Sequence, residues 1–408
     1  MSITKKEKKG PAIPAARQPA TKTPAPARAT TGVQKTSPPV RQVPTARATG
    51  PAATAPAATA PTATARALSE ETRVKLDGLQ SQLGSLQRSL LLTDVSNEVG
   101  SIETTLSLLP SEIEELRTRG YVFRSFLENK AQVLAGQWEE VHTRVSNEIA
   151  RHTRELEHEA DLAGSVLRLG LGGQPTQVTR AESAIQSLQN KVDAAQSATR
   201  AVYKTLQDNV NQTKGQVEQI RWLLDQIDEA SFQLHPAEDP VAACKAQYLE
   251  TEKDGPEGVL YLTDERLFFE QKEEIATKKV LFIITAKKKV QQLTFEVPVG
   301  QIEETQASQK GFLGHKEILE LHFAPEADLS GVTLRLHGAD NEEWAGLIGR
   351  VKSGEITKER TRPKDEAAVE AARTAPTKCP TCGATLSVEI VRGMREITCA
   401  YCGSVIRL

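Results

Sequence analysis

Large apolar side chains are scarce in this chain of 408 residues, and aromatic residues make up only 4% of it. Few large hydrophobic cores can be built from such a composition, so the length predicts two or three small or elongated domains. Long hydrophobic runs are missing too, since the longest purely aliphatic and aromatic stretch is Val280–Ile284. A membrane-spanning helix needs about 20 such residues, and the sequence therefore predicts none.

Recognisable catalytic motifs are also absent. The sequence contains no G-x-x-x-x-G-K-[ST], no H-E-x-x-H and no G-x-S-x-G, and its 7 histidines lie in unrelated contexts. A secretory signal is missing as well, because the basic segment 5–9 is followed by Gly-Pro and not by a hydrophobic segment. The sequence thus predicts a cytoplasmic protein that is not an enzyme.

Acidic residues are nearly absent from residues 1–66, which consist mainly of Ala, Pro and Thr. This segment holds 11 Lys and Arg against one acid, Glu7, for a charge of +10, so the remainder carries −12 to give the net −2. With so little to bury, the segment cannot offset the entropy lost on folding, and we expect a disordered tail. It is either a solubilising linker or a loose electrostatic tether to an acidic surface.

Helical periodicity dominates residues 67–235. Two long runs with apolar residues three and four positions apart predict an α-helical coiled-coil hairpin over 111–234, with its turn at Gly170–Pro175. A hairpin of this kind spaces other domains or associates with a second copy. The seam of the second helix is formed by Val178, Ala181, Ile185, Leu188, Val192, Ala195, Thr199, Val202, Leu206, Val210, Thr213, Val217, Ile220, Leu224 and Ile227.

The helix boundaries are predicted from local signals. A capping box of Ser111 and Glu114 predicts the start of the first long helix, and Gly120 predicts a kink near its base. Two shorter helices are expected at 68–109, with Ser69 as the N-cap of the first. The sequence leaves open whether they pack within one chain or between chains.

After the helices the apolar period changes from helical to alternating, which predicts strands. Gly258–Thr263 and Arg266–Gln271 flank a two-residue turn and are expected to form a β-hairpin. Asp340, three residues before Glu343, is expected to cap a short amphipathic helix. The pattern predicts a small antiparallel β-barrel with a C-terminal helix at 242–353. Further strands are expected at 279–286, 290–297, 316–323 and 332–337.

Two motifs in this region resemble a known family. Gly258-Val-Leu-Tyr-Leu-Thr-Asp-Glu-Arg-Leu-Phe-Phe resembles the opening of a GRAM domain, a relative of the pleckstrin-homology (PH) fold, and Val297-Pro298-Val299-Gly300-Gln301-Ile302 resembles its later step. The chain as a whole resembles a bacterial-type protein that combines a coiled coil, a GRAM domain and a zinc ribbon. The resemblance implies docking on membrane lipids or partner proteins, not catalysis, and it identifies no ligand-contacting residues.

Five lysines bracket the apolar run Val280–Ile284, and this pattern has two interpretations. In the first, a projecting hairpin contacts an anionic membrane, to which each lysine contributes on the order of 1 kcal/mol. In the second, the run is a strand buried on both faces and the lysines are its solvated turns. The candidate membrane contacts are Lys278, Lys279, Lys287, Lys288 and Lys289.

A charged linker at 354–377 leads to the strongest chemical signal, two Cys-x-x-Cys-Gly motifs in residues 378–408. Each motif lets one tight turn, completed by Gly383 or Gly403 in a left-handed conformation, present two thiolates to one ion. Strands are expected at Leu386–Ile390 and Arg395–Thr398, and the whole resembles a zinc ribbon. The predicted ligands of one structural Zn²⁺ are Cys379, Cys382, Cys399 and Cys402.

Other uses of the cysteines are less consistent with the sequence. Disulfides or a redox pair are expected in exported proteins or next to a βαβ pattern, and neither context is present. Cys244, which stands alone, is either a small buried residue or a reactive thiol.

Together these modules predict a non-enzymatic scaffold or adaptor that docks on a protein partner or on an anionic membrane surface as a peripheral protein. The alternative is a nucleic-acid-associated protein that uses the zinc ribbon and the basic tail. Against it, residues 379–408 hold three Arg and two Glu and no basic stripe with interleaved aromatics.

Overall fold

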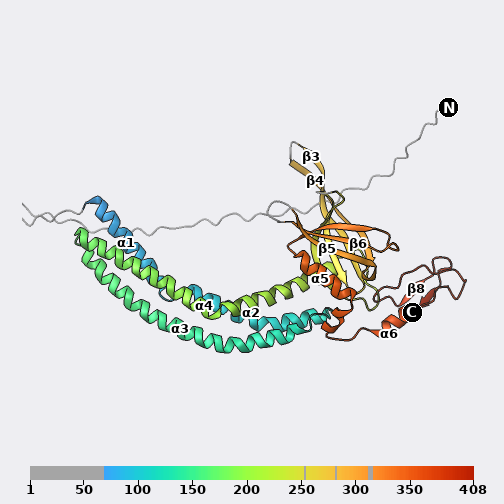
Figure 1. Ribbon diagram of the computed structural model, residues 1–408, viewed down its shortest axis with the longest axis horizontal. Helices are drawn as coiled ribbons and strands as arrows, with labels where there is room; N and C mark the ends of the chain where they lie inside the picture. The colour runs from blue at the N-terminus through green and yellow to red at the C-terminus, as the bar shows by residue number, and fades with distance from the viewer. Residues whose placement is uncertain (1–68, 252–253, 281–282, 311–315) are drawn as a thin grey trace, which may run out of the picture. The chain divides into compact units, whose positions relative to one another are not determined.

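The computed structural model describes residues 69–251, 254–280, 283–310 and 316–408, with the backbone alone between 275 and 288. The basic tail expected at 1–66 lies outside these residues. The described chain begins with four helices, continues into an antiparallel sheet, and ends in a small module that carries four cysteines (Figure 1).

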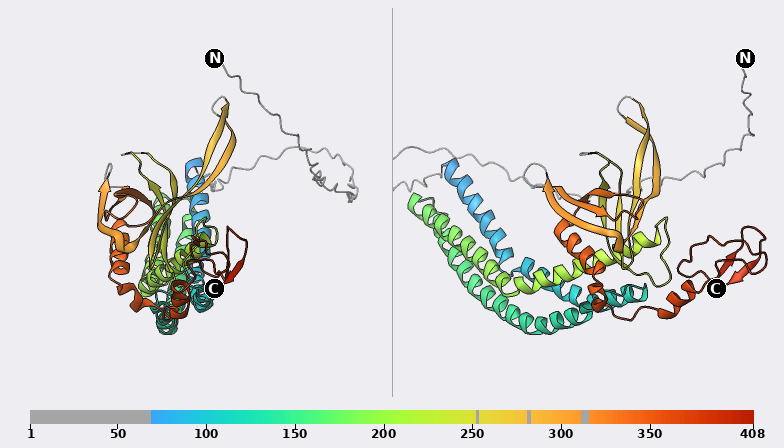
Figure 2. Two further views of the ribbon diagram at one scale, coloured as in Figure 1. Left: turned by 90° about the vertical axis from the view of Figure 1, so that its right-hand side faces the viewer. Right: turned by 45° about the vertical axis from the view of Figure 1, so that its right-hand side comes forward.

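The two longest helices lie side by side over most of their length (Figures 1 and 2). They are α3 (Phe126–Gly170) and α4 (Pro175–Asp228), and Pro175 occupies the first turn of α4, where its missing N–H leaves no hydrogen bond unmade. The predicted seam of α4 is buried, except that Val202 and Ile227 are half-buried and the neighbouring Tyr203 is buried instead of Val202. The helix pairing and its turn are therefore confirmed.

The predicted start of the first long helix at Ser111 is wrong. That residue lies inside α2 (Thr93–Thr118), which continues through Pro110. The helix continues because apolar residues on both sides of the proline, Leu109 and Ile113, are buried on one stripe, and this packing outweighs the lost backbone hydrogen bond. The expected kink at Gly120 is instead the end of α2, where this glycine adopts φ +98.

The two shorter helices pack on the long pair within the same chain. They are α1 (Glu70–Ser89) and α2, and the Ser69 hydroxyl caps α1 as predicted by accepting from the Thr72 amide. Their leucines and valines join the core of α3 and α4. The side chain of Glu98 on α2 bridges to α4, accepting hydrogen bonds from Arg200 at 2.9 Å and from the Tyr203 hydroxyl at 2.5 Å. The hydrogen bond from Arg200 lowers the pKa of Glu98, although burial opposes the shift.

A short link between α2 and α3 joins the helices to the sheet. Tyr121, Val122 and Phe123 are at most 1% exposed. The Tyr121 hydroxyl donates to the carbonyl of Val241 at 3.3 Å, and the Val122 carbonyl accepts from the Thr361 amide at 2.7 Å. The link is thus a structural part of the sheet domain, although 120 residues separate Tyr121 from Val241.

The sheet contains seven antiparallel strands in the order β4-β3-β2-β1-β7-β6-β5. One helix, α5 (Asn341–Lys352), packs against β5 and β6 with Trp344, Leu347 and Ile348 buried. Asp340 caps α5 as predicted, accepting from the Glu343 amide at 2.8 Å. The strands are β1 (Pro240–Tyr248), β2 (Glu257–Thr263), β3 (Arg266–Val280), β4 (Ile283–Pro298), β5 (Ile302–Lys310), β6 (Lys316–Phe323) and β7 (Gly331–His337).

The prediction of a closed barrel is wrong, because the sheet is open. Its two edge strands are β4 and β5, and within the described residues no backbone pairing joins them. The chain turns from one edge strand into the other at 299–301, a single turn of 3-10 helix. The meander and its closing helix are nevertheless those that the alternating pattern predicts.

The single strand expected at 279–286 is also wrong, because the chain reverses direction within it. Val280 at the end of β3 pairs with Ile283 at the start of β4. The strand β2 pairs with β3 only as far as Gln271, so from Lys272 onward β3 has β4 as its one partner among the described strands. The two strands therefore extend past the sheet as a two-stranded arm, residues 272–280 and 283–291 (Figure 1).

Two short helical segments follow the sheet, a 3-10 helix at Glu355–Glu359 and α6 (Glu366–Arg373), and the chain ends with β8 (Glu396–Thr398) paired to β9 (Val405–Arg407). In the described part of the chain, no helix has the length and apolar character needed to cross a membrane.

Candidate functional site: a four-cysteine cluster docked by an ion-pair network

The four predicted cysteines come together at one point of the C-terminal module. All four sulfur atoms lie within 4.8 Å of one another. Two separations between the motifs are 3.7 Å each, that from Cys379 Sγ to Cys402 Sγ and that from Cys382 Sγ to Cys399 Sγ. Four thiols in this arrangement can hold a metal ion such as zinc.

Both motifs have the same backbone geometry. The amide of Gly383 donates to the carbonyl of Cys379 and that of Gly403 to the carbonyl of Cys399, each at 2.8 Å. The two glycines adopt φ +74 and +73, the left-handed step that the sequence predicts. Each tight turn thereby aims two sulfurs at the same point.

A serine supports one side of the cluster. The hydroxyl of Ser404 lies 2.9 Å from Cys402 Sγ and 3.3 Å from Cys379 Sγ. This hydrogen bond lowers the pKa of Cys379 to about 5 and also lowers that of Cys402. Ser404 thus favours thiolates at Cys379 and Cys402, the form of cysteine that binds metal ions. The pKa of Cys382 shifts the other way: a hydrogen bond from the Ala384 amide lowers it, but burial and hydrogen bonds to the neighbouring thiols raise it to about 12.

The sulfur separations distinguish a metal site from disulfides. Four sulfurs placed tetrahedrally at ~2.3 Å from a zinc ion lie ~3.8 Å apart, whereas a disulfide needs ~2.05 Å. The observed 3.7 Å fits the metal site. Within the described part of the module, the hydrophobic cluster contains only Cys379, Cys399 and Ile406 as buried residues.

One strand predicted in this module is wrong. Residues 386–390 form no strand, and β8 pairs instead with β9, which follows the second motif. The reason lies outside the module. The Glu389 carboxylate bonds to His235, and the Arg392 amide donates to the carbonyl of Leu234, so this segment contacts the start of the sheet domain and not a neighbouring strand.

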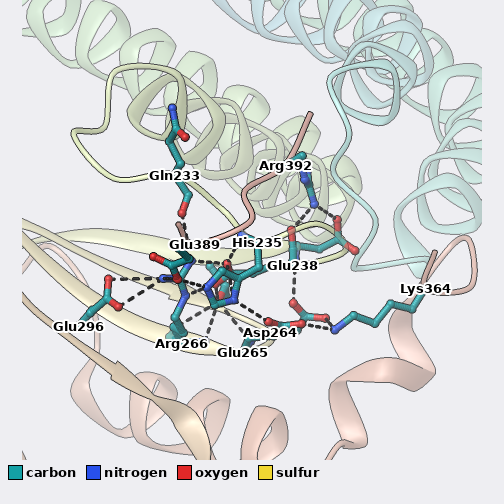
Figure 3. Close-up of polar contacts among 12 residues, drawn as sticks. Gln233, His235, Glu238, Asp264, Glu265, Arg266, Glu296, Lys364, Glu389 and Arg392 are labelled. Carbon is teal, nitrogen blue, oxygen red and sulfur yellow. Dashed lines mark hydrogen bonds and ion pairs between the residues drawn. The ribbon is translucent and has the colours of Figure 1, made fainter. Parts of the chain in front are cut away.

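The centre of that contact is a buried ion pair between Glu238 and Arg266 (Figure 3). Their side chains are 0% and 6% exposed. The guanidinium donates from Nη2 to one carboxylate oxygen at 2.6 Å and from Nε to the other at 3.1 Å. It also lies over the ring of Phe268, 4.6 Å from the centroid. Two-point geometry of this kind is the strong form of an arginine–carboxylate pair.

The cysteine module is held to this pair by His235 and Arg392 (Figure 3). His235 Nε2 lies 2.6 Å from Glu389 of the module, and Nδ1 lies 3.1 Å from Glu265 of the sheet domain. Burial lowers the pKa of His235, but its hydrogen bonds to these two carboxylates raise it by a larger amount, so the net shift of the pKa is upward. Arg392 donates to Asp239 at 2.7 Å and also to the backbone carbonyl of Glu238.

The segment after α5 joins the same network from the other side. Arg360 pairs with Asp239 and, at 3.1 Å, with Asp264, and Lys364 pairs with Glu265 at 2.5 Å. Burial raises the pKa of Asp264. Burial also opposes ionisation of Glu265, but hydrogen bonds from Lys364 and His235 hold its pKa below the ordinary value.

His235, Glu238 and Glu265 lie close enough to hold a metal ion. Arg266 and Lys364 already neutralise their carboxylates, so an ion-pair network accounts for them without a metal. The sequence alone does not identify these residues. The one available signal was the pair of adjacent acids at 238–239 and again at 264–265, which is too common to indicate a site.

The five candidate lysines lie on the arm formed by β3 and β4. Lys278 and Lys279 are close to the end of β3, and Lys287, Lys288 and Lys289 follow the start of β4. Lys289 is exposed and pairs in register with Glu274, and the side chains of the other four lie outside the described part. The backbone thus brings all five lysines onto one arm. Cys244 is buried in β1, and burial raises the pKa of its thiol, so it is not a reactive thiolate.

No protein-family model and no curated protein matches this chain. Among solved structures, the Vps36 N-terminal PH domain aligns over 29% of this chain and 83% of its own, at 15% identity and a TM-score of 0.20. The DH/PH domains of p115-RhoGEF align over 72% of this chain and 97% of their own, at 12% identity and a TM-score of 0.18. The DH/PH fragment of PDZRHOGEF, solved in complex with human RhoA, aligns over 71% and 97%, at 10% identity and a TM-score of 0.22. At such TM-scores the chains do not superpose as wholes, and no function follows from the likeness.

Proposed function

We propose that this chain is a non-enzymatic cytoplasmic adaptor that associates peripherally with anionic membranes. The helices space the other parts, the PH-like sheet domain docks on the membrane, and a zinc-bound module supplies a second small docking surface. The observation that carries the proposal is the arm of β3 and β4, which extends past β2 and holds five lysines within residues 278–289.

The physical argument for membrane docking is electrostatic. A lysine near an anionic membrane surface contributes about 1 kcal/mol, so five on one arm attract it strongly even without a lipid-binding pocket. An arm that extends past its sheet can bring these charges to a surface without moving the sheet core. The assignment of Val280 to the end of β3 and of Ile283 to the start of β4 supports a hairpin over one continuous strand.

Zinc is proposed as the resident metal of the cysteine module, with Cys379, Cys382, Cys399 and Cys402 as ligands. Support comes from the sulfur separations of 3.7 Å and from the small number of other buried residues. A four-thiolate site leaves no open position for a substrate, so the ion would be structural. Its binding energy would fold the module, since its apolar cluster is too small to do so.

The experiment is co-sedimentation of the chain with vesicles of phosphatidylcholine, with and without phosphatidylserine. Residues 1–66 are deleted so that their +10 charge does not mask the arm. Changing Lys287, Lys288 and Lys289 to Glu is expected to weaken binding about 100-fold, because each loses about 1 kcal/mol of attraction. Raising the salt concentration should weaken binding of the parent chain, since exposed charges are screened over about 10 Å at 0.1 M.

The matched control changes Lys204, Lys214 and Lys358 to Glu, which alters the net charge equally at exposed sites away from the arm. Equal loss in both triple variants would mean that net charge alone drives binding. No binding of the parent chain to anionic vesicles would refute membrane docking. A parallel experiment with duplex DNA tests the nucleic-acid alternative, which is favoured if the chain binds DNA and does not bind the vesicles.

A further inference from the structure

The arm formed by β3 and β4 has an edge that no described strand covers (Figure 1). The strand β2 pairs with β3 only as far as Gln271, so the backbone of Lys272–Val280 has β4 on one side and an open edge on the other. At ~3.4 Å per residue, this edge is about 30 Å long. A strand edge offers backbone N–H and C=O groups for pairing, and a ribbon of two strands is only marginally stable by itself. A further strand on this edge would therefore stabilise the arm.

The charges along this edge are divided between its two halves. Glu273 and Glu274 lie in the half next to the sheet. Lys278 and Lys279 lie in the half next to the tip of the arm, and the residues between the two pairs are uncharged. Lys272, at the base of the arm, belongs to the sheet domain, since it pairs with a buried carboxylate there at 3.3 Å. The edge thus has an acidic half and a basic half.

The strand β4 does not supply an acid to the basic half. Lys278 and Lys279 have an alanine and an isoleucine of β4 as their partners in the register. On the acidic half, Glu274 lies opposite Lys289 of β4. A residue inside a sheet has cross-strand neighbours on both sides, so a strand on the open edge can place a second set of charges beside both halves.

A second copy of the same edge has the complementary order of charges. Two β3 edges that pair antiparallel about a two-fold axis near Ala276 place the acidic half of each copy beside the basic half of the other. Opposite charges in such cross-strand positions are stabilising. The ladder of β3 with β4 is irregular between Ala276 and Lys278, so the pairing is defined by the two charged halves and not by single residues.

The other edge of the arm does not favour self-pairing. The strand β4 has three consecutive lysines, Lys287, Lys288 and Lys289, and residues 283–291 include no acid. Two copies of β4 paired antiparallel about this stretch would place lysine opposite lysine, which is destabilising. Lysines on an edge strand are a common means of blocking its pairing. Charge therefore directs self-pairing to the β3 edge.

We infer that this chain forms a dimer through its arms, in which residues 273–279 of two copies pair antiparallel. The product is a four-stranded ribbon with the two β3 strands at its centre and the two β4 strands outside. The three lysines of β4 then lie on the outer strands, where they can still contribute to the membrane docking proposed above. The dimer itself does not depend on that function, because its contacts are between the two copies.

The test measures the molecular mass of the full chain by analytical ultracentrifugation over a range of concentrations. Low ionic strength is used, because exposed charges are then least screened. The parent chain is expected to form dimers. Glu273→Lys with Glu274→Lys should weaken the dimer about 10- to 100-fold, because two basic halves then lie side by side. Lys278→Glu with Lys279→Glu should weaken it similarly, since both halves are then acidic.

Combining the two pairs of substitutions tests the pairing directly. A chain with all four substitutions has its acidic and basic halves exchanged, so its dimer should recover to within about threefold of the parent. An equimolar mixture of the two double variants should form mixed dimers, because each supplies the charges that the other lacks. Neither result is expected if the substitutions merely disturb the fold of the arm.

Two controls separate the β3 edge from other effects of charge. Glu139→Lys with Glu140→Lys makes the same change of net charge at exposed positions of α3 and should leave the dimer intact. Replacing all three β4 lysines by Glu should not weaken the dimer. As a second measurement, Ala276→Cys should give a disulfide between two chains under mild oxidation, because the two-fold axis brings both copies of this residue together. The parent chain, treated in the same way, should not.

The inference is overturned if the parent chain is monomeric at its highest soluble concentration, or if either double variant dimerises as tightly as the parent. It is also overturned if the fourfold variant does not recover, if either control weakens the dimer as much as the edge variants do, or if Ala276→Cys gives no more cross-linked chain than the parent. None of these measurements uses vesicles, so their outcome is separate from that of the membrane experiment.

Discussion

Replacing Arg266 by Met measures how strongly the buried ion pair stabilises the sheet domain. The change removes two donors from Glu238, whose side chain is 0% exposed. Breaking a buried pair on one side costs about 3–5 kcal/mol, because a carboxylate is left buried without its counter-ion. Glu238 keeps hydrogen bonds from the His235 amide at 2.7 Å and the Thr263 hydroxyl at 2.6 Å. We therefore expect the lower end, about 3 kcal/mol, a large share of the stability of an ordinary domain.

The double variant Arg266→Met with Glu238→Gln should recover most of this loss, because it leaves no buried charge. The free energy of unfolding is measured in urea on a chain that keeps Trp344 of α5 as its single tryptophan. As a control, Lys204→Met removes an exposed pair and should cost less than about 0.5 kcal/mol. A loss below about 1 kcal/mol in the single variant, or no recovery in the double, would refute this account.

The buried seam, the metal and the histidine give three further predictions. Leu188→Glu with Val192→Glu should melt the helices, because buried carboxylates cost several kcal/mol. The control, Gln186→Glu with Asn190→Glu on the exposed face, should not melt them. Equal thermal melts of the two double variants by circular dichroism would mean that the seam is misplaced. Elemental analysis should find one zinc per chain. Chelation of the zinc should expose residues 378–408 to protease, and a module that stays protected after chelation would argue against a structural metal. Burial lowers the pKa of His235, but the two carboxylates that face it raise it by more, so its stabilising charge is fully present below about pH 6.5 and is lost as the pH rises through the raised value. Protease cleavage before the module should therefore be faster at about pH 8.5 than at pH 6. His235→Gln should abolish that difference.

What the sequence predicts well is local. The caps at Ser69 and Asp340 and the turns at Gly383 and Gly403 each depend on a few neighbouring residues, and all four have the expected geometry. The α4 seam is similar, since its three- and four-residue spacing fixes one face of the helix whatever the partner. The four cysteines meet for the same reason, because each motif brings two of them together before any distant contact forms.

What the sequence does not predict depends on distant partners. Pro110 is a helix-breaking signal, yet packing of residues on both sides keeps α2 intact. The alternating pattern marks strands but not whether the two edge strands meet, so an open sheet and a closed barrel give the same sequence signal. The contact of His235 with Glu389 spans 154 residues, and no local pattern indicates it.

Arg360 has a consequence for how this chain can be divided. Its side chain, 7% exposed, pairs with Asp239 before β1 and with Asp264 between β2 and β3, and lies 5.0 Å from the ring centroid of Phe123. One residue downstream of the sheet thus contacts both acids and also the link that precedes α3. A fragment cut at 242–353, where the alternating pattern begins and ends, would lose this arginine, Asp239 and the link together, leaving Asp264 without its guanidinium. A fragment that keeps these contacts must therefore run without a break from the link at 121–125 to at least Arg360.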